Sequence, residues 1–216
     1  KIDLLGAYLQ LPLHREARHL TAFVSHVGVF QFRSLPFGLA TGPSAFQQVV
    51  KKILHVLPGC ASILDDIIVY GNTMAEHDQR LRAVLQRLAD ANATIRLDKC
   101  VIGQRSVEFN GHRISAAGMQ LLQSNVAGLL QMPVPVNQKQ LTRFICTATY
   151  YMKFIPGFAD ICEPLRRLQQ SDTWTWSSTC QNTFEALKAK LVTAPILAHF
   201  DVDKRTVLAC DASANA

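Results

Sequence analysis

The stretch Ser62–Tyr70, which reads SILDDIIVY, constrains the fold of this chain more than any other. It places two adjacent aspartates, Asp65 and Asp66, inside a run of apolar and β-branched residues. Neighbouring side chains of a strand point to opposite faces, so an unbroken buried strand would bury at least one carboxylate. A buried carboxylate without a partner is costly and tends to bind a proton or a cation. We therefore expect a hairpin, with residues 61–64 and 67–70 as its strands and the two aspartates as its turn.

Two interpretations of this turn remain open from the stretch alone. Carboxylates at an exposed tip on a rigid apolar stem are an arrangement that can hold a divalent metal ion. Aspartates are also common in turns that have no function beyond the turn itself. The rest of the chain has to decide between a metal site and a plain hairpin.

Composition limits the class of protein. The chain has 216 residues, of which 49% are hydrophobic and 18% charged, enough for one large domain or two small ones. No apolar run reaches the length of a membrane span, and no secretion signal opens the sequence. The six cysteines lack paired CxxC spacing, so we expect reduced thiols of an intracellular protein, with neither disulfides nor zinc. A net charge of +6 suits a polyanionic partner.

Hydrophobic patterns before Gly118 indicate an α+β fold. Residues 1–13 predict strand, turn and strand, and residues 20–35 predict a hairpin that turns near residues 26–28. A helix is expected after Gly42-Pro43, ending at Pro58-Gly59, and a second helix after a capping box formed by Thr73 and Glu76. Short strands are expected around residues 95–97 and 107–114. Helices would then cover one face of a mostly antiparallel sheet.

Helical patterns dominate after Gly118. One helical face carries Leu141, Phe144, Ile145, Ala148 and Ile155 and is stopped by Pro156-Gly157. Another helix runs through residues 184–191, and residues 194–197 form an extended connector. The chain begins and ends inside strand-like patterns, so we expect a fragment of a longer polyprotein or gene, truncated at both ends.

Six motifs, in order and at compatible spacing, resemble the reverse transcriptases of gypsy-type long-terminal-repeat retrotransposons. They are DLLGAYLQ at residues 3–10, LPFGLATGPSAFQ at 35–47, LDD at 64–66, DKC at 98–100, VEFNGH at 107–112 and YYMKFIP at 150–156. The resemblance implies a palm with part of the fingers (residues 1–118), a helical thumb (119–170), a connection (171–203) and the start of an RNase H domain (204–216). Asp211 resembles the first metal carboxylate of that RNase H domain.

The resemblance also implies a two-metal polymerase site. Asp3 and Asp65 would bridge two Mg²⁺ ions, for which Mn²⁺ can substitute. Asp66 would lie beside them with a lesser role, and the Leu4 carbonyl would complete the ligand set. Phosphodiester formation needs such a pair of ions, and Mg²⁺ prefers carboxylates, phosphate oxygens and water. The plain alternative for Asp3 is a strand-end cap.

Other residues would bind substrates by the same resemblance. Tyr8 would exclude ribonucleotides sterically, or be only a core aromatic, and Lys99 would protonate the departing pyrophosphate, or be only a solvated lysine. Phe37, Gly38 and Gln47 are implied in nucleotide binding. The primer and template would contact Phe109, Gly111 and His112 of a primer-holding hairpin and Lys139, Arg143 and Lys153 of a basic thumb helix over residues 139–155. Those basic residues could also form only a solvated face.

Three positions depart from the family pattern. Ile63 stands where a tyrosine is usual, Asn110 where an apolar residue is usual, and Cys146 where glycine is common. Two functions from different classes therefore stay open: an RNA-directed DNA polymerase core, or a catalytically decayed or reused nucleic-acid-binding fragment.

The expected partners follow from the same family. They are an RNA or DNA template with its primer and deoxynucleoside triphosphates, with no membrane. A dimer, or contact with the rest of a Pol polyprotein, is compatible with the resemblance. The expected location is intracellular: the cytoplasm, a virus-like particle or the nucleus.

Overall fold

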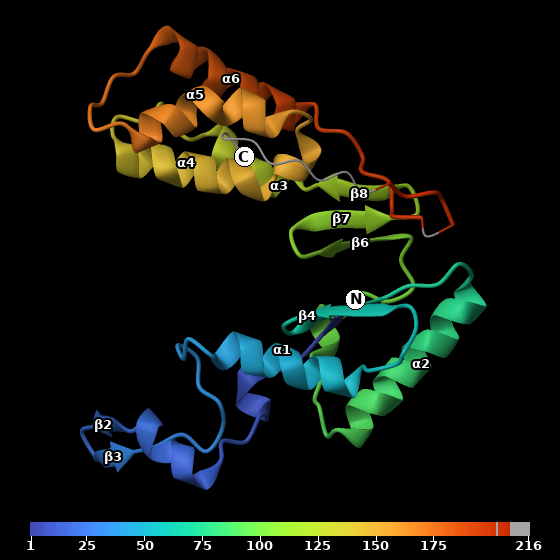
Figure 1. Cartoon of the computed structure of the whole chain (residues 1–216). Helices are drawn as coiled ribbons and strands as arrows, with labels where there is room; N and C mark the ends of the chain where they lie inside the picture. The colour runs from blue at the N-terminus through green and yellow to red at the C-terminus, as the bar shows by residue number, and fades with distance from the viewer. Residues whose placement is uncertain (202, 208–216) are drawn as a thin grey trace. The chain divides into compact units, whose positions relative to one another are not determined.

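The computed structural model describes residues 1–201 and 203–207, and the chain forms two compact units. The first unit is Lys1–Asn110, and the second begins at Gly111. Figure 1 labels the elements of both units along the chain.

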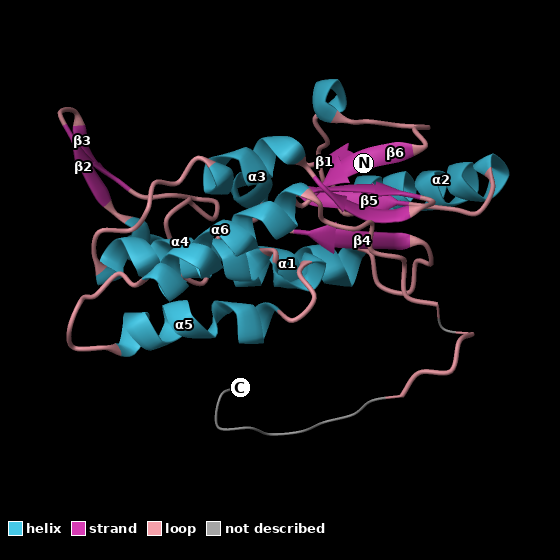
Figure 2. Ribbon diagram, turned by 90° about the horizontal axis from the view of Figure 1, so that it is seen from above, coloured by secondary structure: helices cyan, strands magenta, loops and turns pink. Residues whose placement is uncertain are grey.

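The first unit is built on a three-stranded antiparallel sheet. Its order is β1 (Ile2–Asp3), β5 (Asp66–Val69) and β4 (Cys60–Ile63), so β5 lies in the middle, as Figure 2 shows. Helices α1 (Gly42–Ile53) and α2 (Met74–Asp90) pack on this sheet. Its remaining elements are β2 (Phe23–Ser25), β3 (Gly28–Phe30), β6 (Ser106–Phe109) and the 3₁₀ helices at Ala7–Gln10, Arg15–Thr21 and Leu97–Lys99.

Alternation along the strands determines which face of this sheet is buried. Ile2 and Ile67 are opposed in the register and almost fully buried, as is Val69 two positions further along β5. Phe46 and Val50, one helical turn apart on α1, join the same hydrophobic core. The helices therefore cover one face of the sheet, as the α+β pattern predicts.

Several predicted elements of the first unit are confirmed. The β2–β3 hairpin turns between Ser25 and Gly28, and Figure 1 shows it away from the β1–β5–β4 sheet. Helix α2 begins at the predicted cap, where the Thr73 hydroxyl accepts the Glu76 N–H at 3.2 Å. The Glu76 carboxylate accepts the N–H of Asn72, one residue earlier than the capping-box pattern places it.

Two predicted strand regions of this unit are wrong. Residues 7–10 form a 3₁₀ helix instead of a second strand, because the Gln10 side chain folds back onto the backbone. Its amide donates to the carbonyls of Leu5 at 2.5 Å and Thr94 at 3.0 Å and accepts the Thr94 N–H at 2.6 Å. Near residue 95 only an isolated bridge to Leu4 forms, and Leu97–Lys99 is a 3₁₀ helix.

The predicted end of the first helix is also wrong. Helix α1 ends at Ile53, well before Pro58-Gly59. Turns follow, in which Val56 adopts a φ of 68°. Helical periodicity does not reveal such a change of backbone direction.

The second unit joins a β-hairpin to a helical layer. Strands β7 (His112–Ser115) and β8 (Gly118–Leu121) pair in antiparallel fashion, followed by α3 (Gln123–Leu130), α4 (Gln138–Tyr150), a 3₁₀ helix (Met152–Phe154), α5 (Phe158–Gln170) and α6 (Ser178–Val192). The predicted face of α4 is buried, including Leu141, Phe144 and Ala148. Helix α4 ends at Tyr150, so the helix predicted to reach residue 155 is shorter. Helices α3 and α5 were not predicted.

The connector after α6 adds to the edge of β8. Met119 and Leu197 exchange two backbone hydrogen bonds of 2.8 and 2.9 Å. A Cβ at Gly118 would lie 2.1 Å from the Leu197 carbonyl oxygen, and the φ of Gly118 is 128°. Position 118 therefore requires glycine if the connector is to approach this closely.

Candidate active site

The first unit gathers acidic side chains on the sheet face opposite its core. Asp3 of β1 lies directly opposite Asp66 of β5, and Asp66 lies opposite Ile63 of β4. Directly opposed residues of antiparallel strands point to the same face. Asp3, Asp66 and Ile63 thus form one transverse row, which we call the acidic row.

The turn that carries Asp65 differs from the prediction by one residue. Strand β4 ends at Ile63 and β5 begins at Asp66, so the turn consists of Leu64 and Asp65. The carbonyl of Asp65 accepts the N–H of Leu4 at 3.0 Å. Asp65 therefore lies in the turn beside the acidic row, and its backbone is hydrogen-bonded to the residue that follows Asp3.

Charge compensation is uneven among the three aspartates. Lys1 Nζ lies 3.0 Å from Asp66 Oδ2, and both side chains are about three-quarters covered, with 23% and 24% exposed. Asp3 and Asp65 are half-buried rather than fully exposed, which differs from the expected exposed tip. An ammonium group beside Asp66 lowers the net negative charge that this carboxylate offers to a cation.

Within the part of the chain that the structure describes, the aspartates do not form a complete metal centre. Among the described residues, no group of three His, Cys, Asp or Glu side chains is placed to hold a metal ion. The donors present are nevertheless of the right chemistry, because carboxylate oxygens on one side of a sheet are ligands that Mg²⁺ accepts. Phosphate oxygens and water usually complete such a coordination sphere.

Aromatic residues implied in nucleotide binding come together. The Tyr8 ring lies 5.2 Å from the Phe37 ring and 5.2 Å from the Phe46 ring, between centroids. Phe46 belongs to the core, whereas Phe37 is 63% exposed and Gly38 beside it is also exposed. Tyr8 is half-buried, so one part of its ring packs on the core while the rest stays accessible.

Lys99 and Gln47 have different surroundings. Lys99 is exposed on the Leu97–Lys99 3₁₀ helix. Gln47 is half-buried on α1, and its amide is hydrogen-bonded to residues of β4 and the following turn.

The predicted primer-holding residues divide between the two units. Phe109 ends β6 in the first unit and is buried. Asn110 and Gly111 follow with φ values of 44° and 74°, the positive values that favour Asn-Gly in a two-residue turn. In the second unit, the His112 ring stacks on Phe154 with centroids 5.6 Å apart.

The three predicted thumb cations lie on two elements. Lys139 and Arg143 are exposed on α4, one turn apart. Lys153 lies on the 3₁₀ helix after α4, with its Nζ 5.4 Å from the Phe154 ring centroid. Asp211 lies outside the described residues.

A comparison with protein families identifies the kind of protein that carries this row. Residues 1–114 match the family described as reverse transcriptase (RNA-dependent DNA polymerase), more than half of the chain. The chain belongs to the reverse transcriptase family. Residues 176–216 also match an RNase H-like domain found in reverse transcriptase, and this match begins inside the range predicted as connection.

Relatives that match nearly the whole of this chain are transposon polyproteins. The chain is 35% identical over 220 aligned residues to the transposon Tf2-3 polyprotein of Schizosaccharomyces pombe (strain 972 / ATCC 24843). It is 34% identical over 216 residues to the Tf2-7 polyprotein of the same organism. Each alignment covers 99% of this chain and 16% of the relative, so the chain spans about a sixth of their length. The resemblance to gypsy-type retrotransposons is confirmed.

Solved structures confirm the predicted α+β class. A foamy viral protease-reverse transcriptase in complex with double-stranded DNA matches with a TM-score of 0.85 and 25% identity over 94% of this chain and 36% of that one. The same viral enzyme with an RNA/DNA hybrid matches with a TM-score of 0.79 and 25% identity over 91% of this chain and 27% of that one.

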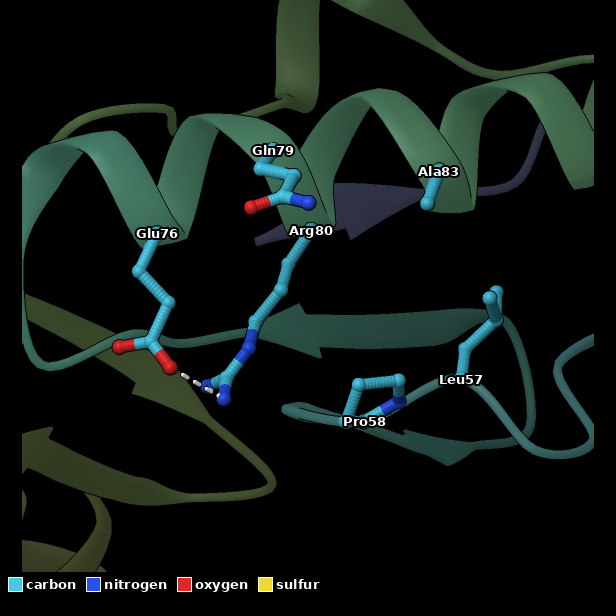
Figure 3. A pocket seen from close by; sticks show the side chains of 6 residues that line it. All are labelled: Leu57, Pro58, Glu76, Gln79, Arg80 and Ala83. Carbon is cyan, nitrogen blue, oxygen red and sulfur yellow. Dashed lines mark ion pairs between the residues drawn. The ribbon is translucent and has the colours of Figure 1, made fainter.

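A shallow groove of the first unit lies away from the reverse transcriptase motifs. The groove lies between α2 and the segment before β4, lined by Leu57, Pro58, Glu76, Gln79, Arg80 and Ala83 (Figure 3). Arg80 spans it, paired with Glu76 at 2.5 Å and bonded to the Tyr70 carbonyl at 2.8 Å. The bond to Tyr70 connects α2 to the residue that follows β5, and none of the acidic-row residues lines the groove.

The sequence did not predict one contact of the segment expected to hold the primer. Asn125 of α3 donates from Nδ2 to the Gly111 carbonyl at 3.2 Å. A Cβ at Gly111 would lie 3.1 Å from that nitrogen and 3.2 Å from the Tyr150 hydroxyl. Asn125 stands outside every motif, so only an expected helix start near residue 123 could have drawn attention to it.

No helix within residues 1–201 and 203–207 is both long and apolar enough to cross a membrane.

Proposed function

We propose that this chain is the core of an RNA-directed DNA polymerase that adds deoxynucleotides to a primer 3′-hydroxyl. The observation that carries the proposal is the direct pairing of Asp3 with Asp66 next to the turn that bears Asp65. Membership of the reverse transcriptase family supports the same activity.

The metal ligands of the proposal are Asp3, Asp65 and the Leu4 carbonyl, with Asp66 in a lesser role. Two Mg²⁺ ions bound there would activate the primer hydroxyl and neutralise the triphosphate. Asp66 already faces the ammonium group of Lys1, which favours a secondary part for it. Tyr8 would stand against the sugar of the incoming nucleotide, with Phe37 and Gly38 beneath its base and Lys99 as the proton donor to pyrophosphate.

Nucleic acid would be held mainly by its backbone. Phe109, Gly111 and His112 would position the primer end, and Lys139, Arg143 and Lys153 would contact phosphates. The foamy viral neighbours, solved with double-stranded DNA and with an RNA/DNA hybrid, support these partners. On this proposal residues 1–118 are the palm, 119–170 the thumb, 171–203 the connection and 204–216 the start of an RNase H domain.

A second candidate function keeps nucleic-acid binding without turnover. Ile63 favours it, because this residue lies in the acidic row, is 41% exposed and replaces the usual aromatic of the family. A branched aliphatic chain there would give a primer terminus less to stack on.

Primer extension on an RNA template distinguishes an active polymerase from a protein that only binds nucleic acid. In the full-length gene product, Asp65→Asn should lower nucleotide addition by at least about a hundredfold, because metal-based charge stabilisation contributes several kcal/mol. Asp90→Asn, at the exposed end of α2, is the matched control and should leave the rate unchanged. Undiminished extension by Asp65→Asn would contradict the site. A wild-type protein that binds duplex but adds no nucleotide would favour the second candidate.

A further inference from the structure

The side chain of Gln47 connects α1 to the hairpin that carries Asp65. Its Nε2 donates to the Ser62 carbonyl at 3.1 Å and lies 3.4 Å from the Ser62 hydroxyl. Its Oε1 accepts the backbone N–H of Leu64 at 2.5 Å. One amide group therefore satisfies both an acceptor on β4 and a donor in the turn.

The turn needs such support because its backbone is strained. Leu64 has a φ of 53°, a left-handed conformation that is unfavourable for a branched side chain. Asp65 is not among the residues with positive φ, so the turn has the φ pattern of type II′, in which glycine usually occupies the first position. Leucine holds this conformation only where its surroundings stabilise it.

The strained residue adjoins the carboxylate of the proposed polymerase site. Asp65 follows Leu64 directly, and its carbonyl accepts the Leu4 N–H at 3.0 Å. Any relaxation of the Leu64 backbone would rotate the peptide that leads into Asp65. The geometry of the turn is therefore coupled to where the Asp65 carboxylate points.

We infer that Gln47 is a positioning residue that holds the Leu64–Asp65 turn and thereby orients Asp65, rather than a residue that contacts the nucleotide. This inference rests on the proposed function, since Asp65 matters for catalysis only if the acidic row acts as described. Both polar atoms of the Gln47 amide are used by the protein itself. No other uncharged side chain of this length can donate to Ser62 and accept from Leu64 at once.

Substitutions at Gln47 separate its two hydrogen bonds. Gln47→Met keeps the approximate length but can neither donate to Ser62 nor replace a carboxamide as acceptor. Gln47→Glu keeps an acceptor for Leu64 and loses the donor to Ser62. Gln48→Met is the matched control, because Gln48 is the next residue of α1 and is exposed.

The first measurement is hydrogen–deuterium exchange of the Leu64 amide in the full-length gene product. Gln47→Met should speed this exchange about tenfold, as expected for a lost hydrogen bond. Gln47→Glu should retain most of the protection, and Gln48→Met should match the wild type. An unchanged exchange rate at Leu64 in Gln47→Met would overturn the inference.

The second measurement is steady-state nucleotide addition by the same variants. Misplacement of a catalytic group by about 1 Å can cost about a hundredfold, so Gln47→Met should lower kcat between about tenfold and a hundredfold with an unchanged KM for the nucleotide. A raised KM at unchanged kcat would indicate direct nucleotide contact and overturn the inference, as would unchanged kinetics with a released Leu64 amide. If the wild type adds no nucleotide, the proposed function fails, while release of Leu64 in Gln47→Met would still support the turn-holding role.

Discussion

Single residues differ in how firmly their surroundings assign them a role. Asp3 and Asp66 are opposed by the register of two strands, so their common face does not depend on a flexible side chain. The role of Tyr8 is less firmly assigned. Its ring contacts Phe46 of the core and the exposed Phe37 at the same centroid distance. A substitution at Tyr8 should therefore affect both stability and sugar selection.

The prediction for Tyr8 uses two variants. Tyr8→Val should admit ribonucleotides while deoxynucleotide use stays largely intact, because only a steric barrier is removed. The lost ring contacts should also lower the free energy of unfolding by about 1–3 kcal/mol, less than for a fully buried aromatic. Tyr8→Phe keeps the ring and should keep sugar discrimination. Kinetics with matched ribo- and deoxynucleotides test this, and unchanged discrimination in Tyr8→Val would mean that the ring only fills the core.

At the scale of elements, short connections decide where functional segments lie. The residues between β6 and β7 have positive φ values, and Gly111 is held by Asn125 of α3. Helix α3 also contains Gly128, at which an added Cβ would meet nothing within 4 Å. The same substitution at these two glycines should thus have opposite effects.

Gly111→Ala should destabilise the protein, and Gly128→Ala should stabilise it. A side chain at the positive φ of Gly111 costs roughly 1–2 kcal/mol, before any displacement of Asn125. Alanine in place of a helical glycine contributes about 0.5–1 kcal/mol of stability. Urea unfolding of both variants measures the two changes. A stabilised Gly111→Ala variant would contradict the positive φ at that position.

The Cys162 thiol on α5 and the Tyr151 hydroxyl after α4 should give the stability of the protein an alkaline limit. Burial raises the pKa of the Cys162 thiol, against a smaller opposing influence from Arg166, and burial likewise raises the pKa of Tyr151. The folded state therefore keeps these protons at pH values where the unfolded chain has lost them.

The free energy of unfolding should consequently fall as the pH rises above the ordinary thiol value of 9.0. The stabilisation is complete below that pH and decreases towards the raised pKa of the folded state. Chemical unfolding at pH 7 to 10.5 measures this dependence. Cys162→Ala should be less stable at pH 7 because of its cavity, with a shallower alkaline decline. An identical decline in that variant would exclude Cys162 as its source.

At the scale of the whole molecule, charge favours nucleic acid without specifying a sequence. The net charge is +6, and Lys139 and Arg143 lie exposed on one helix. Cations that contact phosphates release counterions, so the affinity for duplex should fall steeply as salt rises and depend little on base sequence.

Replacing the exposed cations of α4 should reduce that salt dependence. Lys139→Ala and Arg143→Ala should each lower the slope of log affinity against log salt by about 0.9, if each contacts one phosphate. Lys190→Ala, at the exposed end of α6, should leave the slope unchanged. Duplex binding measured by fluorescence anisotropy across a salt series gives these slopes. Equal slopes for all three variants would remove α4 from the nucleic-acid interface.

Local patterns accounted for much of the fold. The β2–β3 hairpin, α1, α2, α4 and α6 follow from periodicity and turn residues, which act within a few positions along the chain. The family assignment likewise followed from six short motifs and their order. Helix α5 contains Pro164 in its interior, which obscures its pattern, and α3 has only eight residues.

Interactions between distant segments decided the rest. Alternation predicted two aspartates at a turn, but whether Asp66 belongs to the turn or to β5 depends on pairing with Asp3, more than sixty positions away. Residues 7–10 have a strand-like pattern, yet Gln10 bonds to Thr94 and a 3₁₀ helix results. The sequence places Gln47 in a motif. Its hydrogen bond with the Leu64 N–H forms only because α1 packs against the hairpin. Periodicity and short motifs depend only on residues close together in the chain, so the sequence by itself determined most of the elements and the family. Register and side-chain hydrogen bonds depend on which segments meet, so only the tertiary structure decided how the acidic row is assembled and held.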